Sequence, residues 1–191
     1  MLAGLTGGMA CGKSFVARAM DELGARIIEA DEVGHEVLAP GGEAHAAVLG
    51  AFGTTDRREL AAKVFGKPEE LKKLNAIVHP AVRARARRLA EGIAGCDPHA
   101  VVLYVAAILL ESGGLEGMSR LVVVTCTPEQ QLARSLERAG ATEGSVRARL
   151  EHQMPLAEKA ARADYVIDTS GTKEETLRQT KIVFEALKKL A

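Results

Sequence analysis

The hydrophobic positions of this chain fall into short apolar runs that alternate with longer segments in which apolar residues recur every three or four positions. The short runs predict β-strands, and three of them are almost continuously apolar, as in strands covered on both faces. The longer segments predict amphipathic helices. Together they predict an α/β fold in which a five-stranded parallel sheet is flanked by helices. The expected strands are residues 1–6, 26–30, 101–105, 121–125 and 165–168. The expected helices are residues 14–23, 128–139, 143–154 and 173–190, with several more between residues 32 and 95.

Residues 32–97 interrupt this alternation, because they carry helical patterns without an obvious strand. Turn-forming residues punctuate the stretch at residues 40–43, at Gly53 and at residues 66–68. We therefore expect a single domain in which residues 1–31 and 98–191 form the core and residues 32–97 form a helical insertion over the sheet edge. Right-handed crossovers would bring the carboxyl ends of the strands to one edge, where ligands bind.

The charge balance disfavours nucleic acid as a partner. The 191 residues include 25 Lys and Arg against 25 Asp and Glu, so the chain has no basic excess to follow a phosphate backbone. Aromatic residues make up only 3% and Trp is absent, which disfavours a surface for base stacking.

Membrane and secretory functions are disfavoured as well. The longest apolar run, residues 100–110, is shorter than the roughly 20 residues that span a bilayer. No basic segment precedes the apolar start of the chain, as a secretory signal requires. The three cysteines, Cys11, Cys96 and Cys126, are too widely spaced for a CxxC metal pair and too few for a disulfide framework. We expect a protein of the reducing cytoplasm.

Residues 7–14 read GGMACGKS and fit the phosphate-loop pattern GxxxxGK[ST]. The motif follows the strand-like run LAGLT and opens the helical run SFVARAMDEL, which is the order that phosphate binding requires. Backbone N–H groups would surround a β-phosphate, Lys13 would reach the β- and γ-phosphate oxygens, and the Ser14 hydroxyl would bind Mg²⁺. The alternative, a glycine-rich turn with an exposed lysine, fits this context less well.

Two carboxylates end the second expected strand, directly after the phosphate-loop helix. Because this strand belongs to the same parallel sheet, Glu29 and Asp31 are expected near the phosphates. A carboxylate there would orient or deprotonate an attacking hydroxyl. Asp31 would serve equally well as the N-cap of the next helix, and its position alone leaves both interpretations open.

Six segments resemble the dephospho-CoA kinase family, in order and along nearly the whole chain. They are GLTGGMACGKS, LGARIIEADEVGHEVLAPGGEA, LNAIVHPAVR, AAILLESG, TCTPEQQLAR and ARADYVIDTSG. This resemblance implies a P-loop fold related to nucleoside-monophosphate kinases. It also implies ATP-dependent phosphorylation of the ribose 3′-hydroxyl of dephospho-CoA, the last step of coenzyme A synthesis. ATP and Mg²⁺ would be required, neither nucleic acid nor membrane would be a partner, and the oligomeric state is left open.

The resemblance assigns roles to residues outside the phosphate loop. Asp31 matches the catalytic acid of the family and Glu29 its companion, which is usually Asp. His79 and Arg83 match a motif of the helical substrate-binding part. Arg138 matches an arginine of a small lid, here near residues 138–158, that meets the transferring phosphate together with Lys13. His79 has an equal alternative as a cap of a helix opened by Pro80.

The nucleotide site implied by the resemblance combines the phosphate loop with a loop near the adenine that begins at Asp168. The residues expected to bind ATP are Gly8, Ala10, Cys11, Gly12, Lys13, Ser14, Phe15, Asp168 and Gly171.

Several positions depart from the family pattern. Ala10, Cys11 and Phe15 stand where Gly, Ser and Thr are common, so Ala10 requires an unstrained backbone. Cys11, close to a lysine and a helix N-terminus, is expected to be a reactive thiol that ATP protects, unless its sulfur turns into the protein. The third strand lacks the acidic residue of many relatives, and Glu111 is a weak substitute.

Two rival functions stay open. One is another small-molecule P-loop kinase, acting on a nucleotide or a sugar, against which only the later motifs argue. The other is a nucleotide-sensing P-loop protein without transfer activity, against which the retention of Lys13, Ser14, Asp31 and the His79–Pro80 pair argues.

Overall fold

The computed structural model describes residues 1–114, 116–137, 142–151 and 153–191. Five strands form one sheet in the order β2-β3-β1-β4-β5, and the pairs of β1 with β3, β1 with β4 and β4 with β5 are parallel. The α/β fold with a five-stranded sheet is therefore confirmed. The strands are β1 (Leu2–Gly7), β2 (Arg26–Glu29), β3 (Val102–Val105), β4 (Arg120–Thr125) and β5 (Tyr165–Asp168). The helices are α1 (Lys13–Glu22), α2 (Ala30–Leu38), α3 (His45–Phe52), α4 (Arg57–Val64), α5 (Pro68–Cys96), α6 (Pro128–Leu136), α7 (Glu143–Glu151), α8 (Leu156–Ala161) and α9 (Lys173–Lys188).

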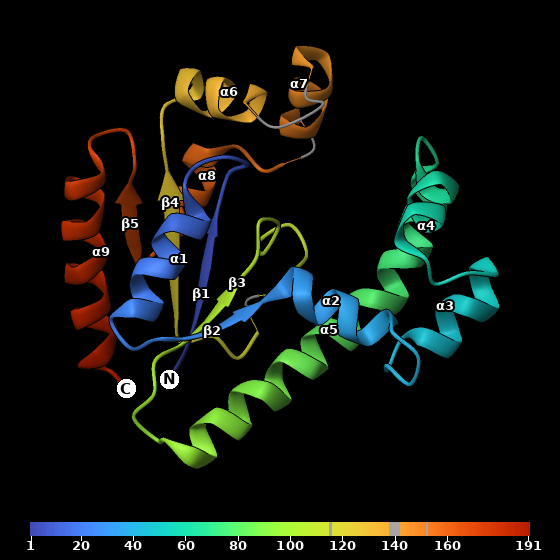
Figure 1. Cartoon of the computed structure of the whole chain (residues 1–191), viewed down its shortest axis with the longest axis horizontal. Coiled ribbons are helices and arrows are strands. Elements are labelled where there is room, and N and C mark those ends of the chain that lie inside the picture. The colour runs from blue at the N-terminus through green and yellow to red at the C-terminus, as the bar shows by residue number, and fades with distance from the viewer. Residues whose placement is uncertain (115, 138–141, 152) are drawn as a thin grey trace. The chain divides into compact units, whose positions relative to one another are not determined.

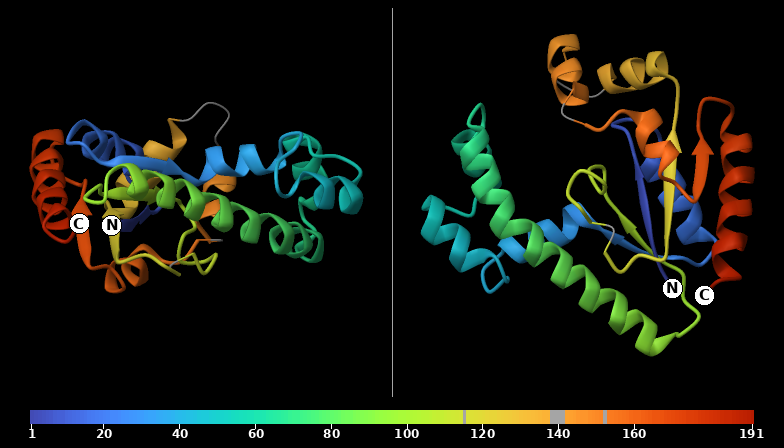
Figure 2. Two further views of the ribbon diagram at one scale, coloured as in Figure 1. Left: turned by 90° about the horizontal axis from the view of Figure 1, so that it is seen from below. Right: turned by 180° about the vertical axis from the view of Figure 1, so that it is seen from behind.

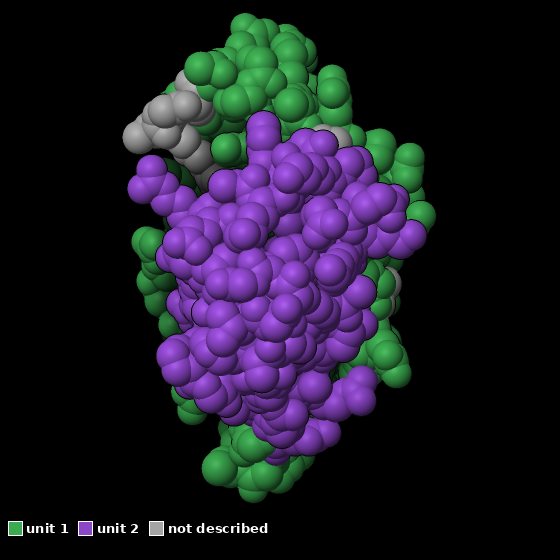
Figure 3. All heavy atoms as spheres, turned by 90° about the vertical axis from the view of Figure 1, so that its right-hand side faces the viewer, with its two compact units in different colours: residues 1–27, 92–191 green, residues 28–91 purple. Residues whose placement is uncertain are grey.

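The chain separates into two compact units, which Figure 3 colours green and purple. Unit 1 consists of Met1–Ile27 and Gly92–Ala191, and unit 2 of Ile28–Glu91. Unit 1 holds four whole strands and the start of β2, and unit 2 holds the helices from α2 to most of α5.

Helices cover both faces of the sheet in unit 1 (Figures 1 and 2). α1 and α9 pack side by side on one face, and α8 lies on the opposite face. Val16 and Met20 of α1 and Leu187 of α9 are fully buried against Leu5 of the central strand. Burial on both faces explains why the central strands read as continuous apolar runs.

The opposite face of β1 depends on a glycine. A Cβ at Gly4 would lie 2.6 Å from Leu109 Cδ2 and 2.9 Å from Met118 Sδ, closer than such atoms approach. The missing side chain therefore lets Leu109, which is fully buried, pack directly onto the centre of the sheet.

Polar contacts tie the helices of unit 2 to one another. His45 Nδ1 lies 2.8 Å from the Leu38 carbonyl oxygen, and the Lys73 ammonium lies 5.4 Å from the centre of the Phe52 ring. The Arg85 guanidinium forms an ion pair with Glu36 at 3.0 Å.

α5 is one continuous helix that contains Pro80 in its interior. The interpretation of Pro80 as the start of a helix, with His79 as its cap, is therefore wrong. The helix begins instead at Pro68, where a fixed φ and a missing N–H suit the first position. Glu69 and Glu70 follow in the first turn, where negative charge is favourable.

The expected helix at residues 143–154 is also longer than the observed one. α7 ends at Glu151, and α8 begins at Leu156 after Pro155, which occupies the N-cap position. No helix within the described ranges is both long enough and apolar enough to cross a membrane.

Candidate functional site

The loop between β1 and α1 lies at the carboxyl end of the central strand (Figure 1). Within it the Cys11 N–H donates a hydrogen bond to the Gly8 carbonyl oxygen at 3.3 Å. Gly12 occupies the N-cap of α1 with φ 81° and ψ 12°, a left-handed conformation that favours glycine. The Phe15 N–H donates to the Gly12 carbonyl oxygen at 3.0 Å. Since glycine has no side-chain oxygen to cap the helix, the N–H groups of Lys13 and Ser14 are left for an anion.

Lys13, Ser14 and Phe15 form the first turn of α1. The Ser14 side chain is exposed and that of Lys13 is half-buried, so both polar groups are accessible from solvent. Gly7 lets the chain leave the sheet close beside β4, because a Cβ there would lie 2.5 Å from the Val124 carbonyl oxygen.

Ala10 has a φ of 59°, the one positive φ outside glycine among the described residues. The left-handed region costs an L-residue about 1–2 kcal/mol, because its Cβ crowds the following carbonyl oxygen. The backbone at Ala10 is therefore strained, contrary to the unstrained conformation that an alanine requires at this position.

Cys11 is fully buried, and its Sγ lies 3.0 Å from Sγ of Cys126, the residue directly after β4. Burial, followed by the neighbouring Cys126 thiol, raises the pKa of Cys11 well above its ordinary value. The expectation of a reactive Cys11 thiolate is therefore wrong, because the sulfur turns into the protein. Cys96 is the exposed cysteine.

The turn after β5 lies against the phosphate loop. The Thr169 hydroxyl lies 3.0 Å from the Cys11 carbonyl oxygen, so the structure brings the segment that begins at Asp168 to the β1–α1 loop. The Asp168 carboxylate accepts the N–H of Ser170 at 2.9 Å and its hydroxyl at 2.7 Å. Asp168 therefore shapes the turn, and Gly171 follows it before α9 begins.

Glu111 forms an ion pair with Lys159 at 2.8 Å and accepts the Met154 N–H at 2.9 Å. Burial by itself raises the pKa of Glu111, but the hydrogen bonds from Lys159 and Met154 outweigh it and hold that pKa below its usual value. Lys159 is fully buried and also donates to the Ala107 carbonyl oxygen at 2.7 Å. Sequence reasoning missed this lysine, whose only signal is a charge on the buried side of α8.

The carboxylates of Glu29, the last residue of β2, and of Asp31, in α2, lie in unit 2. Glu29, not Asp31, is the N-cap of α2, and its side chain makes no capping hydrogen bond. Asp31 lies exposed in the first turn of the helix. The interpretation of Asp31 as an N-cap is therefore wrong, and its carboxylate does not cap α2.

His79 and Arg83 lie one turn apart on α5, both half-buried. Burial, and after it the positive charge of Arg83, lowers the pKa of His79. The imidazole is therefore neutral at pH 7 and can accept a hydrogen bond.

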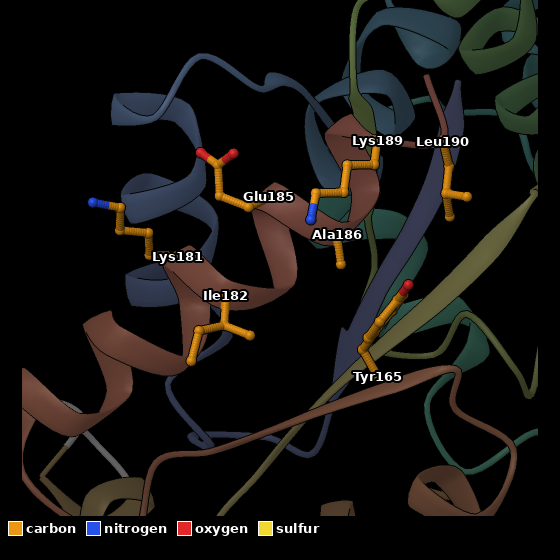
Figure 4. A pocket seen from close by; sticks show the side chains of 7 residues that line it. All are labelled: Tyr165, Lys181, Ile182, Glu185, Ala186, Lys189 and Leu190. Carbon is orange, nitrogen blue, oxygen red and sulfur yellow. The ribbon is translucent and has the colours of Figure 1, made fainter.

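Some expected features lie elsewhere. Arg138, with the other residues up to 141, falls outside the described residues. A shallow pocket of about 550 Å³ lies between β5 and α9, and Figure 4 shows its lining side chains. None of the expected site residues lines it. Its lining residues are Tyr165, Lys181, Ile182, Glu185, Ala186, Lys189 and Leu190.

The described site residues therefore divide between the units. Unit 1 brings together the phosphate loop, the start of α1 and the turn after β5, while unit 2 carries Glu29, Asp31, His79 and Arg83. A parallel sheet whose central strand leads through a glycine-rich loop into a helix that starts with Lys13 and Ser14 defines a P-loop protein, a class that binds nucleotide phosphates.

Comparisons with known proteins identify the family. A family model described as Dephospho-CoA kinase matches residues 1–175. A dephospho-CoA kinase from Geobacillus kaustophilus is 46% identical over 184 residues, which are 92% of this chain and 91% of that protein. A solved structure from Thermus thermophilus has a TM-score of 0.82 and 30% identity, and the match covers 97% of this chain and 96% of that one. A dephospho-CoA kinase structure from Campylobacter jejuni, with a TM-score of 0.73, 23% identity and coverage of 98% and 97%, shares the fold. The chain belongs to the dephospho-CoA kinase family.

Proposed function

We propose that this protein transfers the γ-phosphoryl group of ATP to the ribose 3′-hydroxyl of dephospho-CoA and so produces coenzyme A. The observation that carries the proposal is the loop of unit 1, which presents the first turn of α1, with Lys13 and Ser14, to an anion. Family membership supports the choice of acceptor. The exposed Ser14 hydroxyl is a hard oxygen donor that suits Mg²⁺, which would neutralise charge on the bound phosphates.

Asp31 is proposed as the group that orients and deprotonates the acceptor hydroxyl. Its carboxylate is exposed and is not the cap of α2, which supports this role over the structural one. Lys13 would stabilise negative charge on the transferring phosphoryl group, and Arg138 would join it from the lid.

Glu29, at the end of β2, and His79 and Arg83, on α5, are proposed to bind dephospho-CoA. A neutral imidazole beside a guanidinium, as on α5, offers a hydrogen-bonding group and a charge for a phosphorylated ligand. The turn from Asp168 to Gly171 is proposed to lie near the adenine of ATP, supported by its contact with the phosphate loop.

A lid near residues 138–158 is proposed to close over the reacting groups, because a kinase must exclude water to limit ATP hydrolysis. A cytoplasmic location is proposed as well, supported by the sparse, widely spaced cysteines.

The test is ADP release from ATP and Mg²⁺ in the presence of dephospho-CoA, with AMP, shikimate and gluconate as competing acceptors. Dephospho-CoA should stimulate ADP release far more than the others, and the product should co-elute with coenzyme A. Equal stimulation by another acceptor would move the protein to the rival kinases. Lys13→Ala is the control, since removal of the phosphate-loop ammonium should abolish most of the transfer.

A further inference from the structure

Side chains from outside the phosphate loop hold two of its carbonyl groups. The Gln131 side-chain amide of α6 donates to the Met9 carbonyl oxygen at 3.0 Å. The Thr169 hydroxyl lies 3.0 Å from the Cys11 carbonyl oxygen. These four residues all belong to unit 1.

The planarity of the peptide bond passes this restraint to the next residue. In a trans peptide the carbonyl and the following N–H point in opposite directions. A Met9 carbonyl held by Gln131 therefore directs the Ala10 N–H away from α6, and a Cys11 carbonyl held by Thr169 directs the Gly12 N–H away from the turn after β5. Side chains outside the loop thus orient two of its peptide groups, the one between Met9 and Ala10 and the one between Cys11 and Gly12.

Thr169 is itself held firmly in place. Its N–H donates to the Thr125 carbonyl oxygen at 2.9 Å, which continues the pairing of β5 with β4. Arg134 of α6 donates to the Thr169 hydroxyl oxygen at 3.0 Å and to its carbonyl oxygen at 2.9 Å. The Thr169 hydroxyl oxygen accepts from Arg134, so its single proton points away from that guanidinium. The proton points toward the carbonyl oxygens of Cys11 and Thr125, which lie 3.0 and 3.1 Å from the hydroxyl oxygen.

Further contacts restrain the loop at Gly12 and at Met9. A Cβ added at Gly12 would lie 3.3 Å from Thr169 Cγ2, tighter than most such contacts. Met9 is held at its other end as well, because its N–H donates to Gln153 Oε1 at 3.0 Å. The helix that carries Gln131 begins with a capping box formed by Thr127 and Gln130, which fixes its first turn.

We propose that Thr169 and Gln131 are positioning residues of the phosphate loop, which keep the Gly12 and Ala10 N–H groups directed toward the phosphates of a bound nucleoside triphosphate. The proposal rests on the ATP binding of the proposed function, but not on the identity of the acceptor. Thr169 acts through the backbone and not through contact with the adenine.

The test compares Thr169→Val, which keeps the shape and removes the hydroxyl, with Thr169→Ser, which keeps the hydroxyl. Calorimetric titration with ATP should show a Kd raised roughly tenfold in Thr169→Val, the scale of one charge-assisted hydrogen bond. Thr169→Ser should stay within about twofold of the parent protein. In turnover, the KM for ATP should rise while the KM for dephospho-CoA is unchanged.

Tripolyphosphate separates the phosphate loop from the adenine, because it carries the phosphates without the base. Its Kd should rise in Thr169→Val by the same factor as that of ATP. An unchanged tripolyphosphate Kd, or a Thr169→Ser variant as impaired as Thr169→Val, would overturn the proposal. Gln131→Met provides a second variant at a half-buried position, with the same expected rise for both ligands. Lack of turnover with dephospho-CoA would count against the proposed function alone, since both titrations proceed without an acceptor.

Discussion

The strained backbone of Ala10 predicts that a smaller residue makes the protein more stable. Ala10 has a φ of 59° in the phosphate loop. Replacement by glycine, Ala10→Gly, removes the crowding between Cβ and the next carbonyl oxygen, which is worth about 1–2 kcal/mol. Glycine also has more freedom in the unfolded chain, which costs about 0.4–1 kcal/mol. The net expectation is stabilisation by about 0.5–1 kcal/mol.

Thermal unfolding measures this difference. In a domain of this size a stabilisation of 1 kcal/mol raises Tm by about 2–4 °C, so Ala10→Gly should raise Tm by about 1–4 °C. Ala133→Gly is the matched control, because it makes the same chemical change at an exposed position inside α6, in the same unit. There glycine should destabilise the protein by about 1 kcal/mol and lower Tm.

A fall in Tm for Ala10→Gly comparable to that of Ala133→Gly would refute the reasoning, since both positions would then favour alanine. Opposite signs in the two variants would show that the backbone conformation at residue 10 decides the effect, and not the loss of a methyl group.

Three further predictions concern single side chains. Asp31→Asn should lower kcat by about a hundredfold or more while the Kd of ATP changes little, the scale of general-base catalysis; loss of ATP binding without loss of single-turnover chemistry would contradict this. A thiol alkylating agent should label Cys96 in the native protein and reach the buried Cys11 only after unfolding, with or without ATP, as mass spectrometry of the labelled peptides would show. Glu111→Gln should destabilise the protein by about 3 kcal/mol at neutral pH, because the buried Lys159 ammonium loses its carboxylate partner and keeps its hydrogen bond to the Ala107 carbonyl oxygen. The pKa of Glu111 is lower in the folded protein than in the unfolded chain, so the ionised carboxylate stabilises the fold above the unfolded pKa. This stabilisation is lost as the pH falls through the folded pKa. In urea denaturation, the free energies of unfolding of the parent protein and of Glu111→Gln should therefore converge in acid.

The elements of the sheet were predictable because their signals are local. Each of the five strands lies within one residue of its expected bounds at both ends. A strand buried on both faces is apolar along its whole length, so it can be recognised from its own residues without knowing which strands lie beside it. The phosphate loop was equally readable, since its glycines, lysine and serine all lie within residues 7–14.

Helix boundaries were less predictable where proline is involved. Pro80 lies inside α5, although proline in a helix interior removes a hydrogen bond and usually ends the helix. Pro155 does separate two helices, α7 and α8. The same residue type thus gives opposite results, so a proline by itself does not fix a helix boundary.

The sequence by itself determined the order of the elements, the loop that receives phosphate and the family to which the chain belongs. Only the tertiary structure decided which way Cys11 points, what Glu111 pairs with and what holds the phosphate loop. The partners of Cys11 lie 115 and 158 residues away along the chain, at Cys126 and Thr169. Contacts across such distances leave no periodic pattern, and burial and hydrogen bonding at the folded site set the pKa of a thiol or carboxylate there.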